Sequence, residues 1–381
     1  PYLLGHSFFN IKDIPFLSIW LVCTYCLINI SKVFFEKQII RIKDILILSL
    51  FTAFLMSIRV AGVLIFVQYL IFILTLTTFM KINFLDFFKN FYKKFLISFI
   101  LTLAIFILLQ PSYWQNPLFI IDGIIFMSQH LQTVCTITLG ECMKAQNLPS
   151  SYLPLWFFFK LPLLIIFGLL LFFLIEKKIS EQKLNSIILG SLSFSVIGII
   201  ILLILFNVNF YDEIRQIMFL IPLIFIISLS FIQIFSKKFF YLFTIFFIFF
   251  FTFQNFKIYP YNYIWLNNLS HITKVQGVFE LDYWGASTKN VAKFLNSQKI
   301  SKDTCIITNR NNGVQPFMNQ KSCFLDFKDL HKNNKRPFYV ALMERSLKKG
   351  VPNNCEIIYE EIRNINFSSE NVSLAKIFKC N

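Results

Sequence analysis

Apolar residues gather in long runs that are separated by short polar segments. The runs cover about residues 14–34, 45–58, 61–80, 95–110, 153–175, 186–206, 215–235 and 238–256. Most of them approach the roughly 20 residues that an α-helix needs to cross the hydrocarbon core of a bilayer. The pattern therefore predicts a transmembrane helical domain over residues 1–256, with about eight membrane segments and one long polar loop at 111–152.

Residues 45–80 could form one long helix, or two helices joined by a turn in the sequence SIRVAG at 57–62. The basic residues decide between these alternatives, because cytoplasmic loops are rich in Lys and Arg. A turn places the following basic residues on one side: Lys32, Lys37, Arg41, Lys43, Lys81, Lys89, Lys93, Lys94, Lys177, Lys178, Lys183, Lys237 and Lys238. We therefore predict the turn. The opposite, extracytoplasmic face then contains residues 1–13, Arg59, 111–152, 207–215 and everything after 257.

Composition supports a membrane protein. Hydrophobic residues make up 56% of the 381 residues and charged residues only 15%, and the mean hydropathy is +0.64. A formal net charge of +16 would suggest nucleic acid in a soluble protein. Here the basic residues lie mostly in short loops, where they orient membrane helices, so we expect no nucleic-acid partner. The first residue is Pro, which indicates a chain whose start lies further upstream.

From about residue 257 the sequence becomes mixed and charged. STKNVAKFLNSQ, residues 287–298, has the pattern of an amphipathic helix with Ser287 as its N-cap. Short strands are predicted at DTCIITN, SCFLDF, PFYVALM, CEIIYEE and SLAKIFKC. Residues 257–381 should therefore form a small extracytoplasmic α/β domain with its own core.

Four cysteines of this domain, Cys305, Cys323, Cys355 and Cys380, lie in an extracytoplasmic compartment under this topology. Two disulfides are compatible with that location, and buried free thiols are an equal alternative. Four cysteines allow three pairings, and the sequence does not choose among them. Cys23 and Cys26 form a Cys-x-x-Cys within an apolar run, where we expect packing and not a redox or zinc role.

Ionisable groups at membrane depth are costly and tend to serve function. His6, Asn10, Lys12 and Asp13 precede the first long apolar run, and on one helix His6, Asn10 and Asp13 would share a face. The alternative is a helix cap with interfacial anchoring. Arg59, beside a glycine, could hold a phosphate bidentately or anchor the turn.

Two further polar groups belong to the same face. In the loop 111–152, residues 117–130 form an amphipathic stretch that suits the membrane interface. Its aromatic residues Trp114 and Tyr152, with the nearby Trp156, fit an aromatic belt. Lys160 lies inside an apolar run, where a belt does not explain it. In YDEIRQIMFLIPL, residues 211–223, Asp212 and Glu213 suit a helix N-terminus, whereas the charge of Arg215 is unfavourable there.

Four segments in this order resemble bacterial GT-C glycosyltransferases related to glycosyltransferase family 39 and the dolichyl-phosphate-mannose protein mannosyltransferases. GHSFFNIKDIPF is similar to a Gly-His-Ser/Ala-x-x-Asn-x-Lys-Asp-x-Pro signature that leads into a membrane helix. The others are NLPSSYLPLWFFFKLPL, YDEIRQIMFLIPL, and YPYNYIWLNNL followed by GVFELDYWGASTKNVAKFLN. Two positions depart from the family: Glu213 stands where it has Gly, and Gln216 where it often has His.

The resemblance implies a GT-C-like polytopic α-helical protein of a bacterial inner membrane, with its C-terminal domain outside. It implies inverting transfer of a sugar from a polyprenyl-phosphate donor in the membrane to an acceptor protein, lipid or glycan. No cofactor is expected, and a divalent metal is not indicated. The main catalytic carboxylate would lie upstream of residue 1. Arg59 is assigned from its chemistry and not from a motif.

The resulting site has two catalytic candidates, Asp13 and His6. The predicted substrate-binding residues are Asn10, Lys12, Arg59, Tyr152, Lys160, Asp212, Arg215, Asp282 and Trp284.

Two other classes of function remain open at this stage. A transporter or flippase of lipid-linked substrates also places charges among membrane helices, although it would show polar or interrupted segments near mid-bilayer. An inactive family member could act as a membrane-anchored binding module, which would leave Lys160, Arg215 and the cluster at residues 6–13 unexplained.

Overall fold

The computed structural model describes residues 1–129, 133–174, 183–298, 300, 304–319, 323–332, 337–343, 351, 354–365 and 371–380. The chain divides into two compact units. The helical unit comprises Asn10–Val134 and Lys144–Ile248, and the sheet unit comprises Pro1–Phe9, Cys135–Met143 and Phe249–Asn381. The sheet unit thus contains the predicted C-terminal domain and, in addition, two short segments from earlier in the chain.

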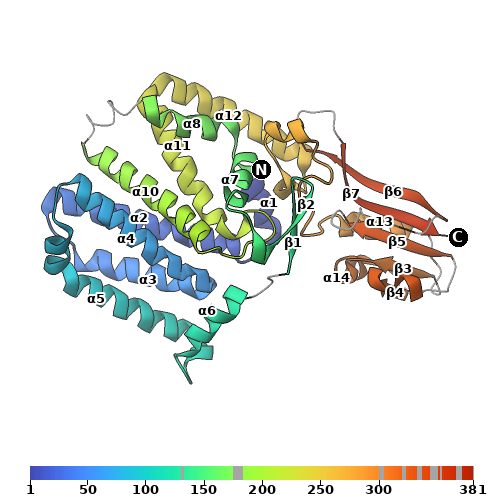
Figure 1. The fold of residues 1–381 in the computed structure, drawn as a ribbon, viewed down its shortest axis with the longest axis horizontal. Coiled ribbons are helices and arrows are strands. Elements are labelled where there is room, and N and C mark those ends of the chain that lie inside the picture. The colour runs from blue at the N-terminus through green and yellow to red at the C-terminus, as the bar shows by residue number, and fades with distance from the viewer. Residues whose placement is uncertain are drawn as a thin grey trace. The chain divides into compact units, whose positions relative to one another are not determined.

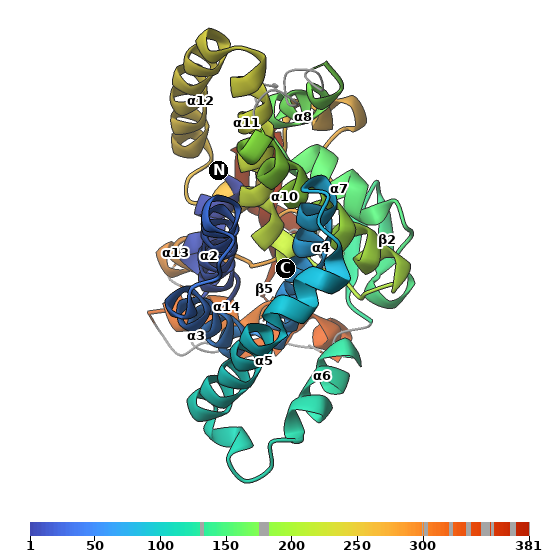
Figure 2. The same ribbon diagram turned by 90° about the vertical axis from the view of Figure 1, so that its left-hand side faces the viewer.

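The helical unit is built from long apolar helices. They are α2 (Asp13–Lys37), α3 (Ile42–Ile58), α4 (Leu64–Phe79), α5 (Phe84–Leu109), α6 (Phe119–Gln129), α7 (Tyr152–Lys160), α8 (Leu163–Leu170), α10 (Lys183–Leu205), α11 (Ile221–Phe235) and α12 (Lys237–Ile258). Figure 1 and Figure 2 show α2 to α5 as neighbouring helices in blue to cyan. The last residues of α12 continue into the sheet unit.

Six helical stretches among the described residues are long and apolar enough to cross a membrane. They are Asp13–Lys37, Val60–Phe79, Phe84–Leu109, Leu184–Leu205, Arg215–Phe235 and Lys237–Ile258. The 17 residues of α3 extend about 25 Å at 1.5 Å per residue, which is short of the roughly 30 Å hydrocarbon core. The part of the chain that the structure describes is therefore mostly helical, and six of its helical stretches have the length and composition of membrane spans, against about eight predicted.

The predicted run at 153–175 is a broken helix and not one straight span. Helix α7 ends at Lys160, and the segment Leu163–Leu174 continues at an angle of 114°. Leu161 is extended, as expected before Pro162, which disfavours helical backbone in the preceding residue. If this bent pair counts as one span, the described residues contain seven.

The predicted turn at 57–62 is confirmed. Arg59 has extended backbone (φ −150°, ψ 139°) and separates α3 from a 3₁₀ turn at Val60–Val63 that leads into α4. The hydroxyls of Thr52 and Tyr69 lie 2.8 Å apart, whereas 17 residues in a straight helix would separate them by about 25 Å. A Cβ on Gly62 would lie 2.8 Å from the Cα of Met56, so the turn depends on close backbone approach.

Five strands form the sheet of the sheet unit, in the order β4-β3-β5-β7-β6. They are β3 (Cys305–Thr308), β4 (Cys323–Asp326), β5 (Phe338–Met343), β6 (Cys355–Asn364) and β7 (Asn371–Cys380). Strand β3 pairs in parallel with β4 and β5, and β7 pairs antiparallel with β5 and β6. All five predicted strands are confirmed, and the α/β domain is visible in Figure 1.

Successive residues of the central strands point to opposite faces of the sheet, and apolar side chains form a core on each face. Ala341 and Met343 of β5 pack with Leu295 of helix α13 (Thr288–Ser297), whereas Val340 and Leu342 pack on the other face. Ser287 is the N-cap residue of α13 as predicted, although its hydroxyl donates to Asp282 (2.5 Å) and not to the helix backbone.

Three disulfides are present. Cys305–Cys323 and Cys355–Cys380 each join directly paired residues of neighbouring strands, which selects one of the three pairings left open by the sequence. The third, Cys135–Cys142, was not predicted. Cys23 and Cys26 are free thiols within α2, and Cys23 is buried.

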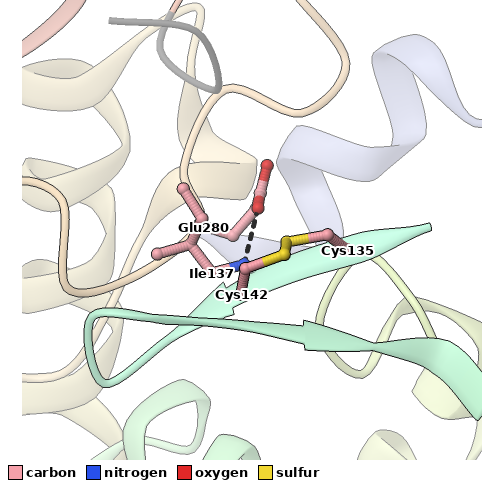
Figure 3. Close-up of a disulfide and its surroundings, with 4 residues drawn as sticks. All are labelled: Cys135, Ile137, Cys142 and Glu280. Carbon is pink, nitrogen blue, oxygen red and sulfur yellow. Dashed lines mark hydrogen bonds between the residues drawn. A yellow bond between two sulfur atoms is a disulfide. The ribbon is translucent and has the colours of Figure 1, made fainter. Parts of the chain in front are cut away.

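The Cys135–Cys142 disulfide closes a hairpin of β1 (Cys135–Thr138) and β2 (Glu141–Lys144) that belongs to the sheet unit. Backbone bonds join it to Val278–Glu280, since the Glu280 N–H donates to the Ile137 carbonyl (2.8 Å). The Ile137 N–H in turn donates to the Glu280 carboxylate (2.9 Å), which Figure 3 shows beside the disulfide. Residues 135–143 are therefore attached by hydrogen bonds to the C-terminal part of the chain, at residues 278–280.

Candidate active site

Asp13 lies between two arginines that come from distant parts of the helical unit. Arg59, at the end of α3, forms an ion pair with one carboxylate oxygen of Asp13. Arg215, at the start of the 3₁₀ turn Arg215–Leu220 ahead of α11, approaches the other oxygen with its Nε at 3.7 Å. The side chains of Asp13, Arg59 and Arg215 are only 7%, 19% and 12% exposed. Three predicted site residues are thus brought together.

Asn10 determines where α2 begins. Helix α1 (Tyr2–Phe9) stops before it, and the Asn10 side-chain oxygen accepts from the Asp13 N–H (2.8 Å). Its amide nitrogen donates to the Asp13 carboxylate (2.6 Å). The predicted helical face through His6, Asn10 and Asp13 is therefore wrong, because an asparagine that bonds to backbone two or three residues on favours a turn over a continuing helix.

The loop before α11 presents Arg215 in an unusual backbone setting. Asp212 lies 3.5 Å from the guanidinium of Arg215, and the ring of Tyr211 lies 5.2 Å from it. Asp212 and Glu213 both have left-handed backbone, with φ of 54° and 66°. That conformation is uncommon for residues other than glycine.

Lys160 and Glu213 form a second ion pair that is fully buried. The Lys160 Nζ lies 2.8 Å from the Glu213 carboxylate, and both side chains are 0% exposed. The Tyr152 hydroxyl donates to the Glu213 carbonyl (3.2 Å), so α7 holds the 212–215 loop at two points. The sequence singled out Lys160 and Tyr152 as substrate contacts, and the structure places both against Glu213.

Some predicted positions lie away from these ion pairs. Lys12 is exposed to solvent. Tyr152 and Trp156 are buried, so the aromatic-belt alternative is wrong for these two, whereas Trp114 is exposed. The amphipathic stretch at 117–130 contains helix α6, several of whose large apolar residues are exposed, and its place in a membrane interface stays a prediction.

The other predicted site residues belong to the sheet unit. His6 on α1 is fully buried, and its Nε2 lies 2.9 Å from the Tyr283 hydroxyl. The rings of Tyr2 and Trp284 lie 4.6 Å and 6.4 Å from the His6 ring. A Cβ on Gly5 would meet the backbone of Tyr263, so α1 packs tightly on this region. These contacts hold His6 within a group of aromatic side chains.

Asp282 organises the turn that precedes α13. Its carboxylate accepts hydrogen bonds from the Tyr263 hydroxyl, the Ala286 N–H (2.9 Å) and both the N–H (3.1 Å) and hydroxyl (2.5 Å) of Ser287. Burial raises the pKa of the Asp282 carboxyl, and these hydrogen bonds oppose that rise. The predicted site residues thus fall into two groups, one in each unit.

Among the residues that the structure describes, no three His, Cys, Asp or Glu side chains gather in a way that could hold a metal ion. Comparisons of the chain with protein-family models, with curated proteins and with solved structures find no match. The fold of the described residues defines a mostly helical protein that has six helical stretches suited to crossing a membrane and a small sheet domain near its C-terminus. The fold alone does not define the function of the protein.

Proposed function

We propose that the protein is a membrane glycosyltransferase that moves a sugar from a polyprenyl-phosphate donor to an acceptor hydroxyl on a protein, lipid or glycan. One observation carries this proposal. A buried carboxylate, Asp13, lies between two arginines at the ends of apolar helices, and the segments that supply Asp13 and Arg215 are two of the four that resemble the GT-C family.

The two guanidinium groups suit a phosphate. A guanidinium presents paired donors that match phosphate oxygens. Two contacts of Arg215, with Asp13 (3.7 Å) and with Asp212 (3.5 Å), are longer than ordinary hydrogen bonds, and in the proposed complex the phosphate takes their place. In the proposed complex Arg59 and Arg215 bind the donor phosphate and release Asp13.

The proposed reaction is a displacement at the anomeric carbon of the sugar. The acceptor oxygen forms a bond to the anomeric carbon from the face opposite the phosphate, and its proton passes to the released Asp13 carboxylate. The bond between the anomeric carbon and the phosphate oxygen breaks, and that oxygen keeps the electron pair. The two arginines stabilise the charge that develops on the leaving phosphate. Attack from the opposite face inverts the anomeric configuration.

Substitution of Asp13 and Arg215 tests this proposal in the full-length protein. Membranes that contain it would receive polyprenyl phosphate carrying a radiolabelled hexose or pentose, and release of free polyprenyl phosphate would be measured. Asp13→Asn should lower the rate by about 10²–10⁴-fold, the usual loss of a general base. Arg215→Ala should abolish transfer, because the donor phosphate loses one of its two guanidinium partners.

Asp86→Asn is the matched control for Asp13→Asn. Asp86 is likewise an aspartate in the first turn of a long apolar helix, but it is exposed. It should retain wild-type turnover. Wild-type turnover in correctly folded Asp13→Asn and Arg215→Ala proteins would overturn the assignment of the site.

One observation favours a second candidate, a transporter of lipid-linked substrates. Helices α7 and α8 form a broken span with the buried Lys160–Glu213 pair at the break, and discontinuous helices with charges at their ends are common in transporters. Reconstituted vesicles distinguish the two functions. A transporter would move a fluorescent polyprenyl-phosphate sugar between leaflets without cleaving it, whereas the glycosyltransferase would cleave it.

A further inference from the structure

Helices α2, α3, α4 and α5 surround an apolar cavity of about 260 Å³ that the proposed reaction does not use. Helix α3 packs on α2 and α5, while α4 packs mainly on α10, and the cavity lies between these two groups of helices. Its lining includes Leu27, Phe34, Ile45, Leu76, Phe87 and Phe99. The cavity is lined mainly by aliphatic and phenyl groups.

The shape of the cavity is elongated. Its lining on α5 extends from Phe87 to Thr102, which is 15 residues, or about 22 Å of helix at 1.5 Å per residue. Lining that extends this far along one helix suits an extended hydrocarbon chain.

The hydroxyl groups that line the cavity already have protein partners. Ser31 donates to the Leu27 carbonyl (2.9 Å), and Thr52 and Tyr69 bond to each other (2.8 Å). Ser98 bonds to Ser49 (2.9 Å), and Thr102 donates to the Ser49 carbonyl (3.4 Å). A polar ligand would gain little from these groups, so the interior favours a ligand that makes no hydrogen bonds.

None of Asp13, Arg59 and Arg215 lines the cavity, and most of its lining lies in the halves of the helices away from Asp13. The first cavity residue on α2, Leu27, follows Asp13 by 14 residues, or about 21 Å along the helix. On α3 the lining residues Ile45 and Leu48 lie in the half of the helix away from Arg59, whereas Thr52 lies in the half that ends at Arg59. The cavity is therefore not part of the Asp13 site.

The end of the cavity at Phe34, Ile40 and Phe87 is strongly basic. The two segments that flank this end contain Lys32, Lys37, Arg41, Lys43, Lys81, Lys89, Lys93 and Lys94, against Glu36, Asp44 and Asp86. Lys94 contacts the lining directly, because its Nζ donates to the carbonyl of Ile40. Basic groups at the end of an apolar space between membrane helices are suited to an anionic lipid headgroup.

We propose that this cavity binds one acyl chain of an anionic phospholipid, with the lipid phosphate at the basic end beside Lys94. The apolar interior holds the chain, and the surplus of Lys and Arg selects a negatively charged headgroup over a zwitterionic one. The site is separate from the donor site of the proposed reaction, and it does not depend on that reaction.

Lipid titration of the detergent-purified full-length protein, followed by native mass spectrometry, tests this inference. Phosphatidylglycerol and phosphatidylcholine with the same acyl chains are the two probes. One phosphatidylglycerol molecule should stay bound at concentrations at which phosphatidylcholine does not. Lys94→Gln should lower the preference for phosphatidylglycerol by about fivefold, the effect of one basic residue near a lipid surface.

A second variant fills the apolar interior. Ile73→Trp places a larger side chain in the cavity and should remove the retained lipid. The control Ile197→Trp adds the same ring at an exposed position of α10, and Lys238→Gln removes an exposed charge at the start of α12. Both controls should bind phosphatidylglycerol like the wild type.

Three results would overturn the inference. The first is wild-type binding of phosphatidylglycerol by an Ile73→Trp protein that unfolds at the wild-type temperature. The second is equal retention of the two phospholipids by the wild type. The third is displacement of phosphatidylglycerol by equimolar polyprenyl monophosphate, which would make the cavity a donor site. None of these readouts measures sugar transfer, so failure of the proposed reaction would be seen separately.

Discussion

Glu213 combines a left-handed backbone with a fully buried carboxylate, and Lys160 compensates the charge. Removal of one partner from a buried ion pair typically costs about 3–5 kcal/mol, whereas replacing both with apolar groups is often neutral or stabilising. Glu213→Gly should therefore destabilise the protein, since Lys160 is left buried without this partner. Glu213→Gly combined with Lys160→Met should recover most of the stability, because glycine adopts the positive φ without strain.

Thermal unfolding of the single and double variants measures this coupling as a double-mutant cycle. Lys160→Met alone should be at least as destabilising as Glu213→Gly, because it leaves the Glu213 carboxylate buried without this partner and does not relieve the positive φ. Additive losses in the double variant would show that the two side chains do not stabilise each other.

Because the pKa of Asp282 is shifted, we expect the free energy of unfolding to depend on pH. Burial raises the pKa of its carboxyl above the ordinary value of 3.8. As the pH rises past 3.8, the unfolded chain releases this proton while the folded protein still holds it, so folding stability falls through that window. Wild-type protein should therefore lose stability relative to Asp282→Ala as the pH rises from below 3.8 through the raised value.

Unfolding temperatures over this pH range check the prediction, with the exposed Asp86→Ala as the control. The difference between wild type and Asp86→Ala should stay nearly constant. Asp282→Ala should be less stable than wild type at every pH, because four donors lose their acceptor. Parallel pH profiles for wild type and Asp282→Ala would contradict the prediction.

Sequence alone could point to Asp13, Arg59, Lys160 and Arg215, because ionisable residues stand out beside apolar runs. It could not pair them, since the ion pairs join segments that are far apart along the chain. From its position in the sequence Glu213 suits a helix N-terminus, and no local pattern indicates that it contacts Lys160. The enclosure of His6 depends on Tyr283, 277 residues later, and no local pattern reports that contact.

Among the elements, the α3–α4 turn depends on the backbone contact at Gly62. A Cβ there would lie 2.8 Å from the Met56 Cα, closer than packed atoms normally approach. Gly62→Ala should therefore lower stability by about 1–3 kcal/mol, as overpacking of a tight site does. Gly123→Ala is the control, because its nearest neighbour, the Tyr113 hydroxyl, would be at an ordinary 3.6 Å. Chemical denaturation in detergent measures both variants, and equal stability of the two would refute the close approach.

The elements that sequence predicted correctly have strong local signals. The five C-terminal strands are short apolar runs between turns, and charge placement indicated the turn at Arg59. Two breaks were missed although their causes are visible, namely the Asn10 turn before α2 and Pro162 after α7. The β1–β2 hairpin was missed because its partners, Val278–Glu280, lie about 140 residues later in the chain.

For the whole molecule, the oxidation state of the cysteines shows whether the sheet unit lies in an oxidising compartment. The chain has 8 cysteines, of which six form disulfides and two, Cys23 and Cys26, are free. Alkylation of the denatured, unreduced protein from its native membrane should therefore label only those two, and reduction first should make all eight reactive. Mass spectrometry of the labelled peptides identifies the positions. Labelling of Cys305 or Cys355 without reduction would place the sheet unit in a reducing compartment.

The sheet unit draws on residues 1–9, 135–143 and everything from 249 onward, and this imposes an order on biosynthesis. When α1 and the Cys135–Cys142 hairpin leave the ribosome, the segments that they pack against have not been translated. At a synthesis rate of about 5–20 residues per second, Tyr283 is added on the order of 10–50 s after α1. The apolar helices between residues 144 and 248 must therefore be synthesised while these early segments still lack their partners in the sheet unit.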